Sequence, residues 1–301
     1  MNRLLLPALA ASLLASCQSL PAEDTRSPRD LPAFDGHTGS PLTWSEVLER
    51  ASAAEVVVLG EMHKDAMGHA VQLAFVEDFL RGPDSALTLE MLERDEQLLI
   101  EDYRDGILDA EGFAKATSSS TWAGESSWAD WYQPIIDAAV AVEARVVAAN
   151  APRRYVRAAR VDGFERLDEI PAPRSALFER PTVELEGDYR ERFHQTMIEA
   201  HAASGTEPSE EDLASLFRSQ LVWDATMAGS IAETLEAGAT RVVHLIGRFH
   251  TDFEGGTHQL LQELRPGTAT LVVSLCPESS GVLADDDVGR ADVVVYTGRP
   301  E

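Results

Sequence analysis

Acidic, imidazole and amide side chains follow four short apolar segments of this chain, and such side chains could bind a metal ion or a polar ligand. They are Glu61 with His63, Glu90, Asn150 and His250. The apolar segments are rich in valine, leucine and alanine and do not alternate with polar residues, which is typical of buried parallel strands. Ligands of open parallel sheets bind beyond the carboxyl ends of the strands. The sequence therefore predicts that these side chains share one edge of a sheet.

The carboxylates and imidazoles of this set indicate metal binding. Glu61, His63, Glu90 and His250 could bind one cation, and mixed oxygen and nitrogen ligands favour zinc, manganese or iron. A bound metal would activate water for hydrolysis. In that case Glu61 could act as the general base instead of as a ligand. The alternative for each histidine is a hydrogen bond to a loop carbonyl.

Two arginines and two further polar side chains could complete the site. Arg248 could bind a carboxylate or phosphate through two parallel hydrogen bonds, or form a surface ion pair. Arg153 lies at an expected helix start, where a cation opposes the helix dipole and a nearby anion is indicated. Asp224, in a mainly apolar helix, could orient a ligating histidine or form a buried ion pair with Arg153. Asn150 would support the site from its strand end.

Extended and helical segments alternate along the chain. The expected strands lie within residues 55–63, 86–90, 145–150, 241–246, 269–275 and 292–296. The expected helices lie within residues 66–80, 93–103, 128–142, 152–160, 189–202 and 210–236. This order predicts an α/β domain over residues 42–301, with three layers and a mainly parallel sheet flanked by helices. The weakly patterned residues 161–208 are predicted to form a helical cap or insertion.

The first 16 residues are typical of a secretory leader. Arg3 gives a positive start, and residues 4–14 are apolar but too short to span a bilayer. The string Leu14-Ala15-Ser16-Cys17 resembles the lipobox of bacterial lipoproteins. This implies that the leader is removed, that Cys17 carries a lipid, and that the protein lies in the cell envelope at the outer membrane, facing the periplasm. Residues 17–41, rich in proline, serine and aspartate, are predicted to be a flexible tether.

Composition and missing motifs exclude several functions. The net charge is −26, with 51 acidic and 25 basic residues, so a basic surface for nucleic acid is lacking. No Gly-x-Ser-x-Gly string is present, which argues against a serine hydrolase. No Gly-x-Gly-x-x-Gly string or phosphate loop indicates nucleotide binding. A Cys-x-x-Cys-His string for covalent haem is missing as well, and with Cys17 lipidated only Cys276 remains, so no internal disulfide can form.

Several strings, taken in order, resemble the ChaN-like family of haem-binding uptake lipoproteins, in the superfamily that includes Tiki, TraB and erythromycin esterase. The strings are Leu59-Gly60-Glu61-Met62-His63 with His69 and Gln72, Leu89-Glu90-Met91 with Asp95 and Gln97, Trp131-Tyr132-x-Pro134, Asn150-Ala151-Pro152-Arg153, the stretch 220–228, and Gly247-x-x-His250. They run from about residue 43 to 261. The resemblance implies an α/β fold, a lipid-anchored protein and haem or iron acquisition.

Haem is therefore the cofactor that the resemblance implies. A haem site needs an apolar slot, an axial ligand and cations for the propionates. The chain offers His63, His69 or His258 as the ligand, and Arg153 or Arg248 as the cation. The wider superfamily implies instead a metal site on the Gly-Glu-x-His and Gly-x-x-His strings, with hydrolase activity in some branches. The sequence leaves this alternative and a homodimer open, and only the lipid on Cys17 would contact a membrane.

Overall fold

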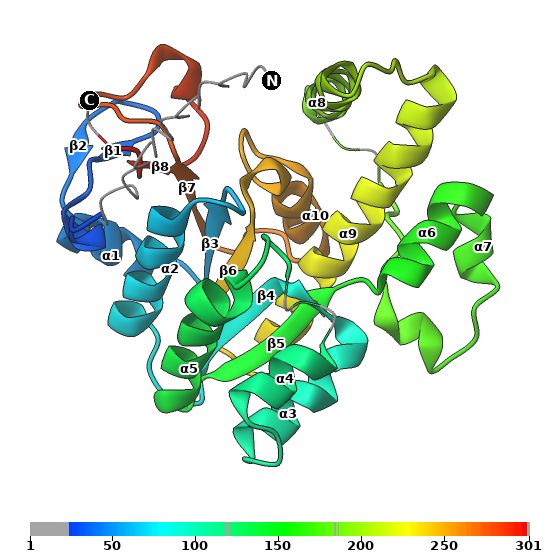
Figure 1. Ribbon diagram of the computed structural model, residues 1–301, viewed down its shortest axis with the longest axis horizontal. Helices are drawn as coiled ribbons and strands as arrows, with labels where there is room; N and C mark the ends of the chain where they lie inside the picture. Colours follow the sequence, from blue (N-terminus) through cyan, green and yellow to red (C-terminus); the bar gives the residue numbers. More distant parts are fainter. Residues whose placement is uncertain (1–23, 118, 120, 184, 186, 300–301) are drawn as a thin grey trace, which may run out of the picture.

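An eight-stranded sheet runs through the centre of the computed structural model, which describes residues 24–117, 119, 121–183, 185 and 187–299 (Figure 1). The strand order is β2-β1-β8-β7-β3-β6-β4-β5. Strands β3 to β8 are parallel, and β1 and β2 are antiparallel to their neighbours. The strands are β1 (Ala33–Asp35), β2 (Pro41–Leu42), β3 (Val56–Glu61), β4 (Ser85–Glu93), β5 (Arg145–Asn150), β6 (Arg241–Gly247), β7 (Thr270–Cys276) and β8 (Val293–Tyr296).

Helices cover both faces of this sheet, so the predicted α/β fold with a mainly parallel sheet is confirmed. One face packs against α1 (Trp44–Ser52), α2 (Ala66–Phe79), α3 (Gln97–Arg104), α4 (Ala110–Ala116) and α5 (Gln133–Ala141). The other face packs against α9 (Glu210–Glu236) and α10 (Gly256–Leu264), and α6 (Arg153–Asp162) lies on α9. Within β3, Val57 contacts the first core and Val58 the second. Burial of both faces explains why the strands read as unbroken apolar runs.

Helix α8 (Tyr189–Ala203) and the start of α9 project away from the sheet (Figure 1). A small core of Tyr189, Phe193 and Phe217 holds the two helices together. Residues 161–208 thus include α7 (Glu165–Asp168), a 3-10 turn (Arg174–Leu177) and α8. Ser209 and Asp212 form a capping box that begins α9.

The N-terminal part of the fold differs from the sequence-based prediction. Residues 28–41, assigned there to a tether, form a 3-10 turn, β1 and the first residue of β2, and β1 pairs with β8. Phe34 packs edge-on against Tyr296, with ring centroids 5.9 Å apart. The two strands have three and two residues, too short to show a periodic pattern among prolines and glycines. The leader, Cys17 and Gln18 lie outside the described residues.

A further difference concerns β4. Strand β4 does not end at Glu90; it continues to Glu93, with a register shift against β5 between Leu89 and Glu93. The helix expected over residues 128–142, with a kink or restart at Pro134, is divided as expected near that proline, into a π-helical turn, Trp128–Tyr132, and α5. Bulges and π-turns often lie beside functional sites, where they redirect a side chain. No helix among the described residues is long and apolar enough to cross a membrane.

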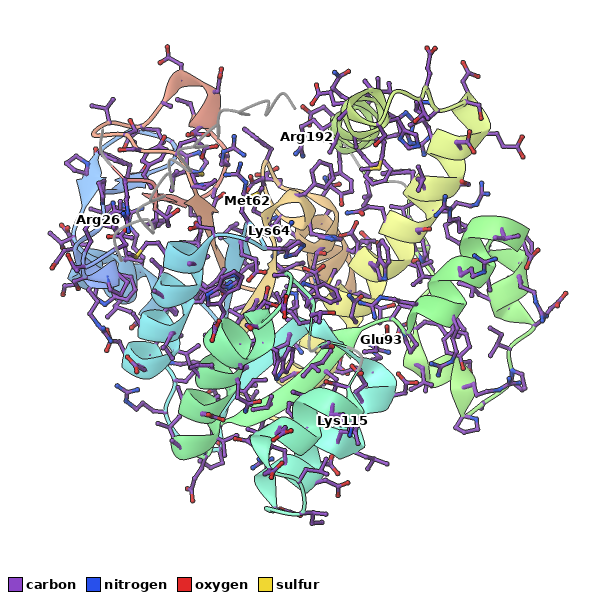
Figure 2. The ribbon with its side chains drawn as sticks, in the orientation of Figure 1. Arg26, Met62, Lys64, Glu93, Lys115 and Arg192 are labelled. Atoms are coloured by element: carbon purple, nitrogen blue, oxygen red, sulfur yellow. The ribbon has the colours of Figure 1, made fainter. Side chains whose placement is uncertain are left out.

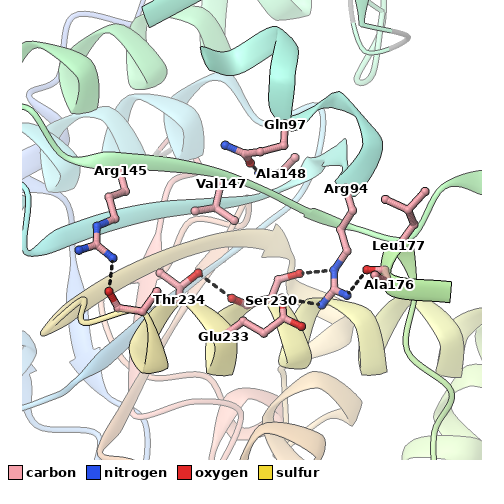
Figure 3. A pocket seen from close by; sticks show the side chains of 11 residues that line it. Arg94, Gln97, Arg145, Val147, Ala148, Ala176, Leu177, Ser230, Glu233 and Thr234 are labelled. Atoms are coloured by element: carbon pink, nitrogen blue, oxygen red, sulfur yellow. Dashed lines mark hydrogen bonds and ion pairs between the residues drawn. The ribbon is translucent and has the colours of Figure 1, made fainter. Parts of the chain in front are cut away.

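The edge strand β5 is closed by side chains instead of by another strand. The Gln97 amide donates to Val146 O and accepts from Ala148 N, as a neighbouring strand would. Beside it lies a cavity of about 320 Å³ (Figure 3). The buried guanidinium of Arg94 crosses this cavity and donates to Ser230 Oγ and Ala176 O. Because its polar groups already bind protein partners, this region serves to join β4, β5 and α9.

Candidate functional site

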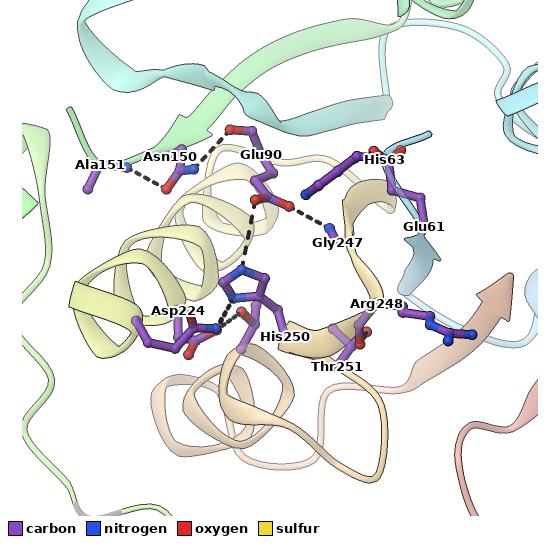
Figure 4. A network of polar contacts seen from close by, with 12 residues as sticks. Glu61, His63, Glu90, Asn150, Ala151, Asp224, Gly247, Arg248, His250 and Thr251 are labelled. Atoms are coloured by element: carbon purple, nitrogen blue, oxygen red, sulfur yellow. Dashed lines mark hydrogen bonds and ion pairs between the residues drawn. The ribbon is translucent and has the colours of Figure 1, made fainter. Parts of the chain in front are cut away.

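The predicted set of side chains lies together at the carboxyl ends of the central strands (Figure 4). Strand β6 lies between β3 and β4, so Glu61 at the end of β3 and Glu90 in β4 flank Gly247. A 3-10 turn after β6 then brings His250 beside Glu90, with Nε2 3.8 Å from Oε1. We call this edge the strand rim. Its geometry follows from the parallel strand order.

Glu61 is a buried carboxylate that accepts three hydrogen bonds. Oε1 accepts from Tyr132 OH (2.6 Å) and from His63 Nδ1 (2.9 Å), and Oε2 accepts from Gln72 Nε2 (2.8 Å). The π-helical turn brings the Tyr132 hydroxyl to this position. Burial alone would raise the pKa of Glu61, but the His63 hydrogen bond and the nearby imidazoles lower it below its usual value. Glu61 is therefore held as an anion inside the protein.

This anion fixes the tautomer and the orientation of His63. Nδ1 donates to Glu61, so the lone pair lies on Nε2. The His63 side chain is 43% exposed, and its ring meets Trp122 edge-on at 5.8 Å. Burial lowers the pKa of His63, but the carboxylates of Glu61 and Glu90 outweigh that effect and raise it. A Cβ at Gly247 would lie 3.2 Å from His63 Cε1, so the small residue leaves room for this ring.

His250 is oriented by a second buried carboxylate. Its Nδ1 lies 2.6 Å from Asp224 Oδ1, and Asp224 also accepts from Tyr189 OH and Thr257 Oγ1, both at 2.7 Å. Burial lowers the pKa of His250, but Asp224 outweighs that effect and raises it. A Cβ at Gly256 would lie 2.5 Å from Asp224 Oδ2, so only glycine fits there. Asp224 thus orients His250 and does not pair with Arg153.

Hydrogen bonds from the two neighbouring strands hold both the side chain and the main chain of Glu90. Gly247 N donates to Glu90 Oε2 at 2.5 Å, and the Asn150 amide donates to Glu90 O at 3.0 Å. The register shift in β4 releases this part of the strand from regular pairing, which turns the Glu90 side chain toward the rim. The Asn150 side chain therefore supports Glu90 by binding the Glu90 main-chain oxygen.

The strand rim does not form a metal centre. Among the described residues, no three His, Cys, Asp or Glu side chains are arranged to hold a metal ion. The oxygens of Glu61 and Asp224 already accept hydrogen bonds from protein groups. The metal alternative for Glu61, His63, Glu90 and His250 is therefore not supported, and a metal-activated water loses its basis.

A cavity of about 720 Å³ opens beside the strand rim, and we call it the rim cavity. Met62, which follows β3, and Arg192 of α8 both line this cavity and are labelled in Figure 2. Phenylalanine and methionine side chains line it together with charged and amide side chains, and its volume suits a small organic ligand. The lining side chains include Met62, His63, Arg192, Phe193, Met197, Gln220, Arg248, Phe249, His250, Asp252, Phe253 and Arg290.

The other candidate residues have different positions. His69 is buried, with Nδ1 3.0 Å from Gln72 Oε1 and 3.4 Å from Glu61 Oε2 and its ring stacked on Trp131, so it supports Glu61 and does not line the cavity. His258 lies on α10 with Nε2 3.0 Å from Oγ1 of Thr270, the first residue of β7, and does not line the rim cavity. These contacts leave neither ring facing a ligand at the rim.

The two arginines also differ in position. Arg248 lines the rim cavity and donates to Cys276 Sγ at 3.0 Å. Arg153 pairs with Glu93 at 3.0 Å, its guanidinium carbon lies 5.1 Å from the centre of the Trp122 ring, and it does not line the rim cavity. Arg248 is thus placed to meet a ligand anion in the cavity.

Sequence analysis missed several residues of the site. Tyr132 and Gln72 occur in the family-like strings but were given no role, because nothing in their spacing shows that they reach Glu61. Tyr189, Arg192 and Arg290 come from segments without a recognisable motif. The packing of α8 against α9 places Tyr189 and Arg192, and ion pairs with Asp252 and Asp287 place Arg290.

A family model and solved structures resemble the whole of this fold. Residues 47–261 match the model described as haem-binding uptake, Tiki superfamily, ChaN. The structure titled cofacial heme binding to ChaN of Campylobacter jejuni has 17% identity and a TM-score of 0.65, covering 88% of this chain and 96% of that one. At this identity the likeness shows the fold alone.

Other solved structures are more distant, and their similarity is too low to inform function. The type III effector HopBA1 has 11% identity and a TM-score of 0.47, covering 91% of this chain and 99% of that one. An erythromycin esterase mutant, EreC, in its open conformation has 11% identity and a TM-score of 0.43, covering 88% of this chain and 83% of that one. No curated protein sequence matches the chain.

Proposed function

The chain belongs to the haem-binding uptake family of the Tiki superfamily, ChaN, and on that premise we propose that it binds haem in the rim cavity with His63 as an iron ligand. The observation that carries the proposal is the hydrogen bonding of the two His63 ring nitrogens. Its Nδ1 is bound to buried Glu61, and no hydrogen bond from the described residues uses Nε2. A carboxylate behind an imidazole is the usual arrangement for a histidine that ligates a metal.

The walls of the rim cavity suit a porphyrin. Met62, Phe193, Met197, Phe249 and Phe253 provide an apolar slot beside His63. Such a slot, an axial imidazole and nearby cations are what non-covalent haem binding needs. When bound, the haem would supply the iron, while the chain's own residues exclude water and orient the imidazole.

Other residues of the rim keep His63 available. Tyr132 and Gln72 hold the Glu61 carboxylate in place, so that Glu61 cannot turn away from His63 Nδ1. His250, also on the cavity wall, is oriented through Asp224 and can hydrogen-bond a ligand on the opposite side. Arg248 provides a cation on the same wall.

Titration of the protein with haemin tests this proposal. We expect a saturable shift of the Soret band for the unaltered protein and, for His63→Ala, an affinity at least about tenfold lower, because one iron ligand is lost. His37→Ala is the matched control, since His37 is exposed, does not line the rim cavity and lies 3.8 Å from its partner Asp292. A Soret shift with the same affinity in His63→Ala would refute the assignment of His63.

We also propose that the protein is anchored in the cell envelope through a lipid on Cys17, at the outer membrane and facing the periplasm. Support comes from the lipobox-like string Leu14-Ala15-Ser16-Cys17 and from membership of an uptake family. A Cys17→Ser chain should move from the membrane fraction to the soluble fraction and lose incorporation of labelled fatty acid. Retention of the label in Cys17→Ser would contradict the anchor.

A further inference from the structure

Four arginines lie on one exposed side of α6, in a chain whose net charge is −26. At 3.6 residues per turn their positions fall within an arc of about 120°, and Val161, which is 63% exposed, lies in the same arc. The buried residues of α6 lie on the opposite side and pack against α9. We call the exposed side the arginine stripe, and its cations are Arg153, Arg154, Arg157 and Arg160.

Two of these arginines are held in place and still keep donors for a partner. Arg153 Nη1 lies 3.0 Å from Glu93, and Arg154 Nη1 lies 2.7 Å from Asp95. Each guanidinium also lies over an aromatic ring, with its carbon 5.1 Å and 4.5 Å from the ring centre. Both side chains remain half exposed, at 50% and 52%. A guanidinium has five N–H groups, so one ion pair leaves others to bind a further carboxylate.

The other two arginines have no acidic partner. Within the described residues, no ion pair or hydrogen bond joins the side chain of Arg157 or of Arg160 to another group. The charge of Arg160 acts on Asp212, but that carboxylate already caps the start of α9. Arg218 of α9 donates to Arg160 O at 2.9 Å and adds a cation at the end of the stripe.

Neither helix stability nor solubility accounts for the stripe. The first turns of a helix carry partial positive charge, so cations there destabilise it, and Arg153 and Arg154 occupy the first two positions of α6. Because the net charge is already −26, cations reduce the charge that keeps the protein soluble. Positions that break a local rule without structural gain are expected at functional sites.

We propose that the arginine stripe docks an acidic segment of a partner protein. This inference goes beyond haem binding and does not depend on it. Arginines at positions i, i+4 and i+7 of a helix lie in one row, and their guanidinium groups bind carboxylates through paired hydrogen bonds. Acidic side chains spaced along a single polypeptide match that row, and Val161 gives the partner an apolar contact.

A narrow polypeptide suits the stripe better than a flat anionic membrane. Asp162 and Glu165, which follow the stripe along the chain, are exposed and make no ion pair within the described residues. A flat surface that reached the stripe would also approach these acids and be repelled, whereas a single segment avoids them. The lipid anchor proposed above precedes β1, and α6 lies at the other side of the sheet from β1 and β2 (Figure 1).

Fluorescence anisotropy of labelled poly-L-glutamate tests the proposal, with the full chain carrying Cys17→Ser so that no lipid contributes. We expect saturable binding at low ionic strength that is lost at about 0.5 M salt, because salt screens exposed charges. Arg157→Gln combined with Arg160→Gln should weaken binding about tenfold, since each exposed ion pair contributes little and the two act together. Arg104→Gln combined with Arg190→Gln is the matched control, because it removes the same charge from exposed positions on α3 and α8 and should leave the affinity within about twofold.

Three outcomes would overturn the proposal. The first is an absence of saturable binding to poly-L-glutamate. The second is an equal loss of affinity in the two double variants, because net charge and not the stripe would then decide binding. The third concerns vesicles of equal parts phosphatidylglycerol and phosphatidylcholine: tighter binding to these than to poly-L-glutamate, lost in Arg157→Gln with Arg160→Gln, would assign the stripe to a membrane. The haemin titration is independent of all three, so failure of the docking proposal leaves the haem proposal standing.

Discussion

Removal of the Tyr132 hydroxyl should destabilise the protein more than removal of a similar hydroxyl at the surface. Tyr132 is fully buried and donates to the Glu61 carboxylate at 2.6 Å. In Tyr132→Phe the buried anion loses one donor and gains no water. Hydrogen bonds to charged groups contribute about 1.5–3 kcal/mol, and we expect the free energy of unfolding to fall by that amount.

Tyr103→Phe provides the matched control for this prediction. Tyr103 OH donates to Asp137 at 2.5 Å, a comparable bond, but at an exposed position where water can replace the hydroxyl. Its loss should change the free energy of unfolding by less than about 0.5 kcal/mol. Urea unfolding of the haem-free proteins, followed by circular dichroism, measures both changes. Equal effects of the two substitutions would show that burial of the Glu61 anion does not decide the energetics.

Three further substitutions or conditions test other parts of the fold. Burial and the charge of His250 lower the pKa of His244 to about 3, so the folded state binds fewer protons than the unfolded state and loses stability as the pH falls below about 6.5. Relative to His244→Asn, the unaltered protein should lose about 2.3 kcal/mol between pH 6.5 and 4.5 in urea unfolding, and parallel pH profiles would contradict this. Burial raises the pKa of the Cys276 thiol to about 11. In the Cys17→Ser protein at pH 8, a thiol reagent should therefore react with the native protein at least about a hundred times more slowly than with the unfolded protein. Equal rates would be inconsistent with a buried thiol. In Gly256→Ala, at the start of α10, the new Cβ would lie 2.5 Å from an Asp224 oxygen, and the free energy of unfolding should fall by about 1–3 kcal/mol. An unchanged urea midpoint would show that α10 can shift to admit the methyl group.

The sequence predicted the central strands and the side chains at their ends for the same physical reason. Runs such as residues 56–59 are apolar throughout because helices cover both faces of the sheet. Once the strands are parallel, the residues that follow them must meet at one edge, which is why Glu61, His63, Glu90 and His250 lie together. This part of the site depends only on strand direction and order.

Residues that reach the site from helices and turns could not be predicted in this way. Tyr132 points to Glu61 only because a π-helical turn replaces regular helix before α5. Arg192 and Arg290 are close only because the turn after His250 is folded around Asp252. Strands β1 and β2 are too short for a periodic signal; β1 pairs with β8, and β2 pairs with β1. Each of these features depends on packing between segments far apart in the sequence.

The carboxylates of the strand rim support our proposal that this edge binds a porphyrin. Glu61 accepts hydrogen bonds from three side chains, and Asp224 likewise accepts from neighbouring side chains, so little lone-pair capacity remains for a cation. Such carboxylates hold the neighbouring imidazole in one tautomer and leave it as the available ligand. One imidazole nitrogen suffices for an iron that a porphyrin already holds, whereas a bare divalent ion needs several protein ligands. On our proposal, the hydrogen bonds that occupy these carboxylates therefore leave His63 Nε2 available to ligate haem iron.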